Sequence, residues 1–311
     1  MNNLFQFKTL TEFTDFFRDE ETCVKHFTAV RFANGGYCPH CGNTKIHLFA
    51  NGKRYRCAGC KQDFTIKTGT VFGESKLPLR KWFMAIYLLS TTSKGISSVQ
   101  LAKHVGVTQK TAWFMAHRIR QAHKQNGNQF TGTVESDETY IGGKASNMHK
   151  KVRKTKIRGR GFIDKAIVHG MIQRAQGDQI SQVKASVIQN TQRETIAPIL
   201  AENIVAGSTL YTDTAGAYKQ IETALNHAMV DHAKGYVVGD CHTNNIESFW
   251  AIFKRGYNGV YHQMSRKHLH RYVNEFAFRF NRRKTAMQSV FSEVVSGIAE
   301  SAQFPYKTLT Q

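Results

Sequence analysis

The chain is poor in acidic residues and has no long hydrophobic run. It carries 22 Asp and Glu against 43 Lys and Arg, which gives a formal charge of +21. The longest apolar run covers residues 82–89, too short to span a bilayer. No basic segment followed by an apolar one opens the chain, so we expect no secretory signal and no membrane partner.

Two further patterns are missing from the sequence. A GxxxxGK[ST] phosphate loop and internal repeats are both absent, which argues against nucleotide-driven chemistry and repeat architectures. A hydrophobic content of 41% is enough for real cores, so the chain is not a disordered one. The excess of positive charge predicts a polyanionic partner, most economically nucleic acid.

Cysteine is scarce but regularly spaced. Four of the six cysteines form two C-x2-C pairs with fifteen residues between them: Cys38, Cys41, Cys57 and Cys60. This spacing predicts a structural Zn²⁺ site, in which four thiolates leave no position open for chemistry. The alternative of two disulfides requires an oxidising compartment. Without a secretory signal, and with Cys23 and Cys241 left over as single residues, we expect the bacterial cytoplasm.

The first half of the chain divides into three expected regions. Residues 1–30 form an amphipathic helical lead-in with Phe13, Phe16 and Phe17 on one face, and residues 31–68 form a zinc ribbon. Residues 76–126 contain a helix-turn-helix pattern, a Ser-capped helix and a Thr-capped helix separated by a turn at Gly106.

The second helix of this pattern is strongly basic. We expect its cationic side chains to contact phosphates and base edges in a major groove: Lys110, His117, Arg118 and Arg120. The alternative is a helical connector with a solvated basic face.

The second half, residues 132–300, has the texture of an α/β layer domain. We expect strands at 133–141, 162–173, 182–188, 208–212 and about 228–232, and helices at 193–203, 245–257, 267–283 and 287–300. Residues 144–165 contain nine Lys or Arg and one acid. This segment is either a phosphate-gripping loop or an ordinary solvated loop.

Acidic residues stand at the ends of expected strands and helices. Period-two alternation puts Glu135 and Asp137 on one face of their strand, and Ser136 and Glu138 on the other. Asp213 ends a strand.

A third acid opens a helix. Glu247 stands at its start, and Lys254 lies two turns along on a neighbouring face. Together with Asp137 and Asp213, Glu247 would form a cluster that repels itself unless divalent cations neutralise it. The pattern therefore suggests two Mg²⁺ or Mn²⁺ ions, with Lys254 holding a phosphate. The alternative is that acids at strand ends occur in any α/β domain.

Several motifs resemble one family in their order along the chain. The stretches that carry the resemblance are CPHCG and CAGC, KTGTVF at 67–72, KLPLRKW at 76–82, KTAW at 110–113, ESDETYIGG at 135–143, YTD at 211–213, HTNNIESFW at 242–250, KRG at 254–256, GVYH at 259–262 and EFAFRFN at 275–281. They are similar to the transposases of the IS1595 insertion-sequence family, which carry an ISXO2-like DDE domain.

The resemblance implies an RNase H-like catalytic domain that moves its own DNA element. Matched residue by residue, three acids fall on the metal-binding positions and a lysine on the basic position that follows: Asp137, Asp213, Glu247 and Lys254. Some relatives have Asn at the third position, so Asn244 and Asn245 leave the third ligand open. The implied partners are the terminal inverted repeats and target DNA, bound by at least a homodimer in the nucleoid.

Two other functions remain open from the sequence. A DNA-binding regulator would use the ribbon and the helix-turn-helix, and its α/β domain would only dimerise. Such a regulator has no need for clustered acids with a phosphate-binding lysine. An RNase H-like nuclease without joining activity would use the same metals, so the sequence barely separates it from a transposase.

Overall fold

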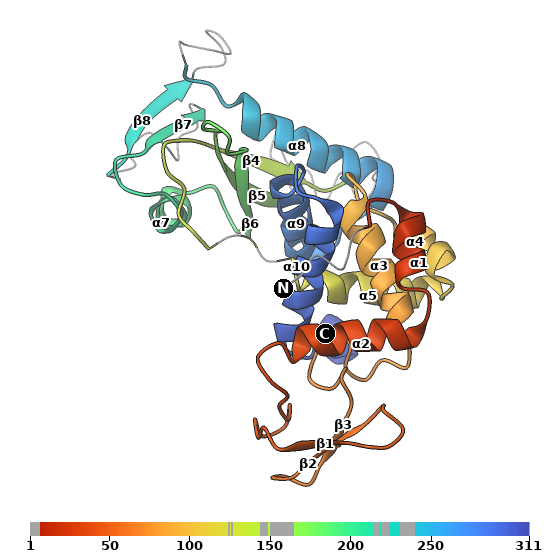
Figure 1. Ribbon diagram of the computed structural model, residues 1–311. Helices are drawn as coiled ribbons and strands as arrows, with labels where there is room; N and C mark the ends of the chain where they lie inside the picture. Colours follow the sequence, from red (N-terminus) through yellow and green to blue (C-terminus); the bar gives the residue numbers. More distant parts are fainter. Residues whose placement is uncertain are drawn as a thin grey trace. The chain divides into compact units, whose positions relative to one another are not determined.

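The computed structural model describes residues 7–123, 125, 127–143, 149, 165–213, 218, 224–230 and 240–310. The chain forms two compact units (Figure 1). The first, the helical unit, takes residues from both ends, 1–123 and 285–311. The second, the sheet unit, takes residues 124–284. Among the described residues, no helix is long and apolar enough to cross a membrane.

The helical unit is built around an aromatic core. Its helices are α1 (Leu10–Phe16), α2 (Glu20–Arg31), α3 (Leu79–Thr91), α4 (Ser98–Val105), α5 (Gln109–Arg120), α10 (Met287–Glu300) and α11 (Tyr306–Thr310). Phe13 and Phe17 are buried as expected, whereas Phe16 is partly exposed. The Phe13 ring centroid lies 4.5 Å from that of Tyr87 and 5.3 Å from that of Phe291. Rings from α1, α3 and α10 therefore share one core.

Three short antiparallel strands form the zinc ribbon inside this unit. They are β1 (Ile46–Leu48), β2 (Tyr55–Cys57) and β3 (Asp63–Phe64), in the order β1-β2-β3. The stacked rings of Tyr55 and Phe64, 5.3 Å apart, hold β2 against β3. Because such a small sheet buries little apolar surface, its stability depends on further cross-links such as a bound metal ion.

The capped helix pair expected within residues 76–126 is present as α4 and α5. The Ser97 side chain accepts from the Gln100 N–H, and the Thr108 side chain from the Thr111 N–H. Gly106 ends α4 with φ of 67°, a left-handed conformation that costs glycine little. Local sequence signals therefore determine both ends of this turn.

One boundary differs from the expectation. We expected the α/β domain to run to residue 300, but α10 packs on α2 and α3 in the helical unit. Its buried face includes Phe291, Val294 and Ile298. The apolar period predicts this helix and its ends correctly. It does not reveal which of two cores the helix joins, because both are apolar.

The sheet unit contains a five-stranded mixed sheet in the order β6-β5-β4-β7-β8. The strands are β4 (Thr133–Ile141), β5 (Ala166–Gln173), β6 (Gln182–Ile188), β7 (Thr209–Asp213) and β8 (Asn226–Val230). β4 and β5, and β5 and β6, are antiparallel, whereas β4, β7 and β8 run parallel. The expected basic loop at 144–165 lies outside the described residues except 149 and 165, as do residues 162–164 and 231–232 of two expected strands.

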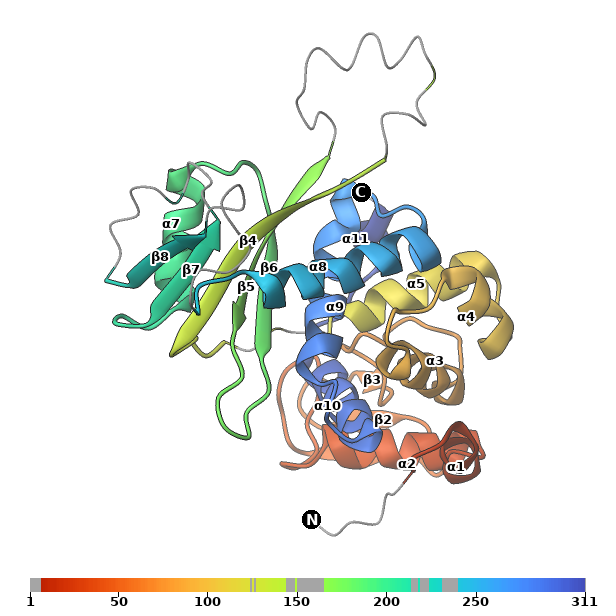
Figure 2. The same ribbon diagram turned by 90° about the horizontal axis from the view of Figure 1, so that it is seen from above.

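Helices cover both faces of this sheet. α7 (Arg193–Asn203) packs on one face through Ile196 and Leu200. α8 (Asn244–Gly256) and α9 (Arg266–Asn281) pack on the other, and a π-helical turn, η3 (Tyr257–Tyr261), follows α8. Figure 1 shows α7 and α8 on opposite sides of the sheet. Figure 2 shows α8 crossing β4 and β5, which places one face of this helix over the middle of the sheet.

Candidate active site and metal centre

The four cysteines of the predicted zinc site lie together. Their Sγ atoms all lie within 4.8 Å of one another. The Sγ atoms of Cys38 and Cys60 are 3.7 Å apart, and those of Cys41 and Cys57 are 3.6 Å apart. Zn–S bonds of about 2.3 Å in tetrahedral geometry require sulfurs about 3.8 Å apart. The thiols therefore fit a closed Zn²⁺ centre, and none of them forms a disulfide.

The two cysteine turns share one backbone design. The fourth residue after each first cysteine, Gly42 or Lys61, is left-handed, with φ of 76° and 59°. Each of these residues donates its N–H to the carbonyl of the first cysteine, Cys38 or Cys57. Both turns thus direct two thiols to one point, as their spacing predicts.

The acidic pocket begins with the pairing of two parallel strands. Glu135 on β4 is opposite Tyr211 on β7 in the register of the sheet. Two residues further along each strand stand Asp137 and Asp213. Side chains two positions apart share a face, so both carboxylates lie on one face of the sheet, Asp137 in the middle of β4 and Asp213 at the carboxyl end of β7.

The third carboxylate comes from α8, whose first turn is held by β4. The fully buried Glu135 carboxylate accepts the N–H groups of Asn245 and Ile246, at 2.9 and 3.0 Å. Arg174 Nε donates to the same carboxylate at 2.7 Å. The N-cap residue, Thr243, makes no side-chain cap of its own. A glutamate on the sheet therefore caps α8 and fixes the turn that carries Glu247.

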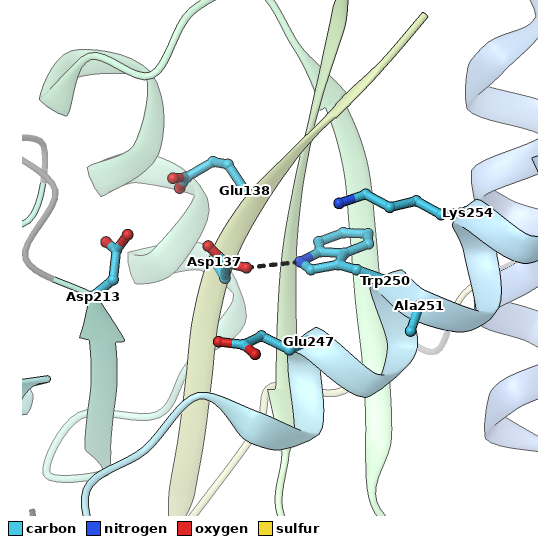
Figure 3. Close-up of a pocket in the computed structure, with 7 residues that line it drawn as sticks. All are labelled: Asp137, Glu138, Asp213, Glu247, Trp250, Ala251 and Lys254. Carbon is cyan, nitrogen blue, oxygen red and sulfur yellow. Dashed lines mark hydrogen bonds between the residues drawn. The ribbon is translucent and has the colours of Figure 1, made fainter. Parts of the chain in front are cut away.

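These groups enclose a cavity of about 430 Å³ (Figure 3). Its lining residues are Asp137, Glu138, Asp213, Glu247, Trp250, Ala251 and Lys254. All four residues expected to form the catalytic site are among them. Asn244 is exposed and does not line the cavity, and Asn245 bonds to Glu135 through its side chain.

Two carboxyl groups of the pocket have raised pKa values. Burial foremost raises the pKa of Asp137 to about 6, and the charges of Asp213 and Glu247 add to the rise. Burial also raises the pKa of Glu138 to about 7. Oxygen ligands that repel one another are the donor set that suits Mg²⁺ or Mn²⁺, since a cation would relieve the repulsion.

Glu138 is an acid that the sequence reasoning did not assign to the site. Its carboxylate accepts from the buried Tyr218 hydroxyl. Ser136 is hydrogen-bonded to both Tyr218 and His169, at 3.1 and 2.8 Å. Strand alternation places Glu138 on the face of β4 opposite Asp137, yet the Glu138 side chain lines the same cavity. The one sequence feature that could have indicated a role for Glu138 in the site is its position next to Asp137.

The structure corrects the expected DNA-reading helix. On α5, Lys110 is exposed, but His117, Arg118 and Arg120 are buried, with exposed fractions of 0%, 4% and 3%. Arg118 donates to the carbonyls of Val71 and Gly73, at 3.1 and 3.0 Å. Side chains enclosed in this way do not present their charges to a DNA groove.

Fold and site together define a zinc-ribbon protein with an acidic pocket in a mixed α/β domain. Residues 18–63 match the family described as transposase zinc-ribbon domain, and residues 129–281 match the ISXO2-like transposase domain. The chain belongs to the IS1595 family of transposases. The family expected from the sequence motifs is thereby confirmed.

Two curated relatives agree with this assignment. An uncharacterized protein in transposable element ISH50 of Halobacterium salinarum is 29% identical over 276 residues, which cover 85% of this chain and 91% of the relative. An uncharacterized transposase-like protein of Haemophilus influenzae is 28% identical over 121 residues, 37% of this chain and 95% of the relative. No solved structure gave a significant match.

Proposed function

We propose that this chain is a DNA transposase with an RNase H-like catalytic domain. It cleaves phosphodiester bonds at the ends of its element and joins the exposed 3′-hydroxyls to target DNA. The observation that carries the proposal is the gathering of Asp137, Asp213, Glu247 and Lys254 around one cavity within the matched transposase domain. A regulator that only binds DNA has no use for such a cavity.

Two Mg²⁺ or Mn²⁺ ions are the proposed catalytic cofactors, held by Asp137, Asp213 and Glu247. Such ions supply a more acidic attacking water or hydroxyl and stabilisation of the leaving oxygen. Glu247 is preferred to Asn244 as the third ligand because Glu247 lines the cavity and Asn244 does not.

The protein's own groups have separate tasks in the transfer. The attacking water or 3′-hydroxyl loses a proton as its oxygen bonds to phosphorus. The bond from phosphorus to the leaving oxygen breaks at the same time, and the leaving oxygen takes up a proton. Lys254 lines the same cavity from the α8 side, where its ammonium group can bind a non-bridging phosphate oxygen. Binding there would position the phosphorus beside the carboxylates.

DNA contacts are proposed for two exposed parts of the helical unit. One is Lys110 at the start of α5. The other is the β1–β2 hairpin, where His47 is opposite Arg56 and the Phe49 N–H bonds to the Arg54 carbonyl. These four hairpin side chains are all exposed, and cations with an aromatic ring suit phosphates and bases. Two element ends and a target, all in the nucleoid, imply at least a homodimer on DNA.

The proposal is tested with single substitutions of the acids. Asp137→Ala, Asp213→Ala and Glu247→Ala should each abolish cleavage and joining of labelled element ends, while binding of terminal repeats persists. Lys254→Ala should be milder, because phosphate positioning is lost and the metal ligands remain. Mn²⁺ should replace Mg²⁺, whereas Ca²⁺ should support binding only.

Asn244→Ala is the matched control, a change in the same first turn of α8 but outside the cavity. Loss of chemistry in Asn244→Ala with activity retained in Glu247→Ala would contradict the choice of third ligand. Cleavage without any joining would favour the nuclease. Unchanged joining in both Asp variants would reject two-metal catalysis.

A further inference from the structure

Gly170 leaves a gap in the sheet beside the candidate metal ligands. It pairs with Asp137 in the antiparallel ladder of β4 and β5. A Cβ atom added at Gly170 would lie 2.6 Å from both Cη2 and Cζ2 of Trp250, and 3.2 Å from Ile246 Cδ1. Carbon atoms in contact lie about 3.5–4.0 Å apart. The indole ring therefore occupies the space that any other residue at position 170 would fill.

The gap brings the indole to the Asp137 carboxylate. Trp250 is buried, with an exposed fraction of 3%, and its Nε1 donates to Asp137 Oδ2 at 3.0 Å. Figure 3 shows the ring lying beside β4 with its nitrogen toward Asp137. Tryptophan has a single polar atom, a donor, so phenylalanine at position 250 would leave this carboxylate oxygen without its bond.

We propose that Gly170 and Trp250 form a positioning pair that orients the Asp137 carboxylate for divalent cation binding. The inference rests on the proposed function and goes beyond its ligand set. Hydrogen-bond partners of ligating carboxylates fix their orientation, and their loss costs about 10–100-fold in metal affinity. A purely structural role for Trp250, as one more ring in the core under α8, would not change metal affinity.

The test measures Mn²⁺ binding to the full chain without DNA, by the electron paramagnetic resonance signal of free Mn²⁺. Trp250→Phe keeps a ring in the core and removes the N–H donor. It should weaken Mn²⁺ binding about 10–100-fold while the far-UV circular dichroism spectrum is unchanged. Phe253→Leu is the matched control, since Phe253 is buried in the same core and on the same helix but does not line the cavity.

A double-mutant cycle tests the gap itself. Gly170→Ala should lower the urea midpoint in the wild-type background, because its Cβ meets the outer edge of the indole. The loss should be smaller in the Trp250→Phe background, since phenylalanine lacks that outer ring edge.

Equal Mn²⁺ affinity in Trp250→Phe and wild type would overturn the inference, as would equal weakening in Phe253→Leu. Additive effects of Gly170→Ala and Trp250→Phe on stability would contradict the claim that Gly170 makes room for the indole ring. Absence of Mn²⁺ binding in the wild-type protein would instead reject the proposed two-metal function, and this inference with it.

Discussion

Two acids on the same face of β4 have opposite surroundings. Glu135 is fully buried, and its carboxylate is bound by Arg174 and by the first turn of α8. Asp137, two residues along, opens onto the cavity and has a raised pKa. Alternation in the strand predicts the shared face of both acids. The groups that surround the two acids come from β5, from Arg174 just after it and from α8, all distant in the sequence. The sequence pattern alone therefore does not distinguish the structural acid, Glu135, from the proposed metal ligand, Asp137.

At this scale we predict the effect of removing Glu135. Glu135→Ala should lower the free energy of unfolding by about 3 kcal/mol or more, because a largely buried arginine and a helix start lose their partner. Urea denaturation measures the change, and Glu135→Gln, which keeps an acceptor, should cost less. Glu300→Gln, at an exposed site, should stay within about 0.5 kcal/mol. A loss no greater in Glu135→Ala than in this control would contradict the capping role.

Among the elements, α5 departs most from the expectation. Its last six residues are all buried, which includes three of the four side chains expected to contact DNA. Arg118 instead satisfies two carbonyls in the segment before α3. The partners of Arg118 lie more than 40 residues earlier in the chain and leave no signal in the sequence of α5. The basic residues of α5 alone therefore predict a solvent-exposed helix.

We therefore predict different outcomes for two cations of α5. Arg118→Ala should lower the free energy of unfolding by about 1–3 kcal/mol, because buried carbonyls lose their donor. Lys110→Ala should leave stability within about 0.5 kcal/mol and weaken DNA binding. Fluorescence anisotropy against salt should show a shallower slope for Lys110→Ala and for Arg54→Ala. A DNA-binding defect confined to Arg118→Ala, with normal stability, would restore the original interpretation.

Elements with local signals were predicted best. The bounds of β4, β6, α7 and α10 agree with the expectation, because apolar period and flanking polar residues mark their ends. The cysteine spacing likewise predicts that the four thiols lie together. What the sequence did not predict depends on contacts distant along the chain: the cap from Glu135, the gap at Gly170 and the core that α10 joins.

In the whole molecule, each unit contains a histidine that resists protonation, the half-buried His26 and the fully buried His169. Burial lowers the pKa of His26 in the helical unit, and of His169 in the sheet unit, from 6.5 to about 4. The folded state thus binds fewer protons than the unfolded state between these values. The contribution of each histidine to stability is fully present above pH 6.5 and is lost as the pH falls toward 4. In the sheet unit the raised pKa values of Asp137 and Glu138 act in the opposite direction.

For the helical unit we predict a loss of about 2 kcal/mol from His26 between pH 7 and pH 5, measured by urea denaturation. His26→Phe should flatten the pH dependence of the helical unit, because its neighbours Phe17, Phe83 and Phe291 accept another ring. Tryptophan fluorescence of Trp82 and Trp113, in a Trp250→Phe background, reports this unit. An unchanged pH slope in His26→Phe would exclude this histidine as a source of acid sensitivity.

The division of the helical unit between both ends of the chain has a consequence for synthesis. The ribosome delivers the entire sheet unit before α10, so that unit can fold during translation. The helical unit obtains Phe291, which packs against rings of α1 and α3, only after the whole sheet unit has been made. A nonsense mutation after residue 284 would leave every metal ligand encoded, yet its product would lack part of the aromatic core of the helical unit.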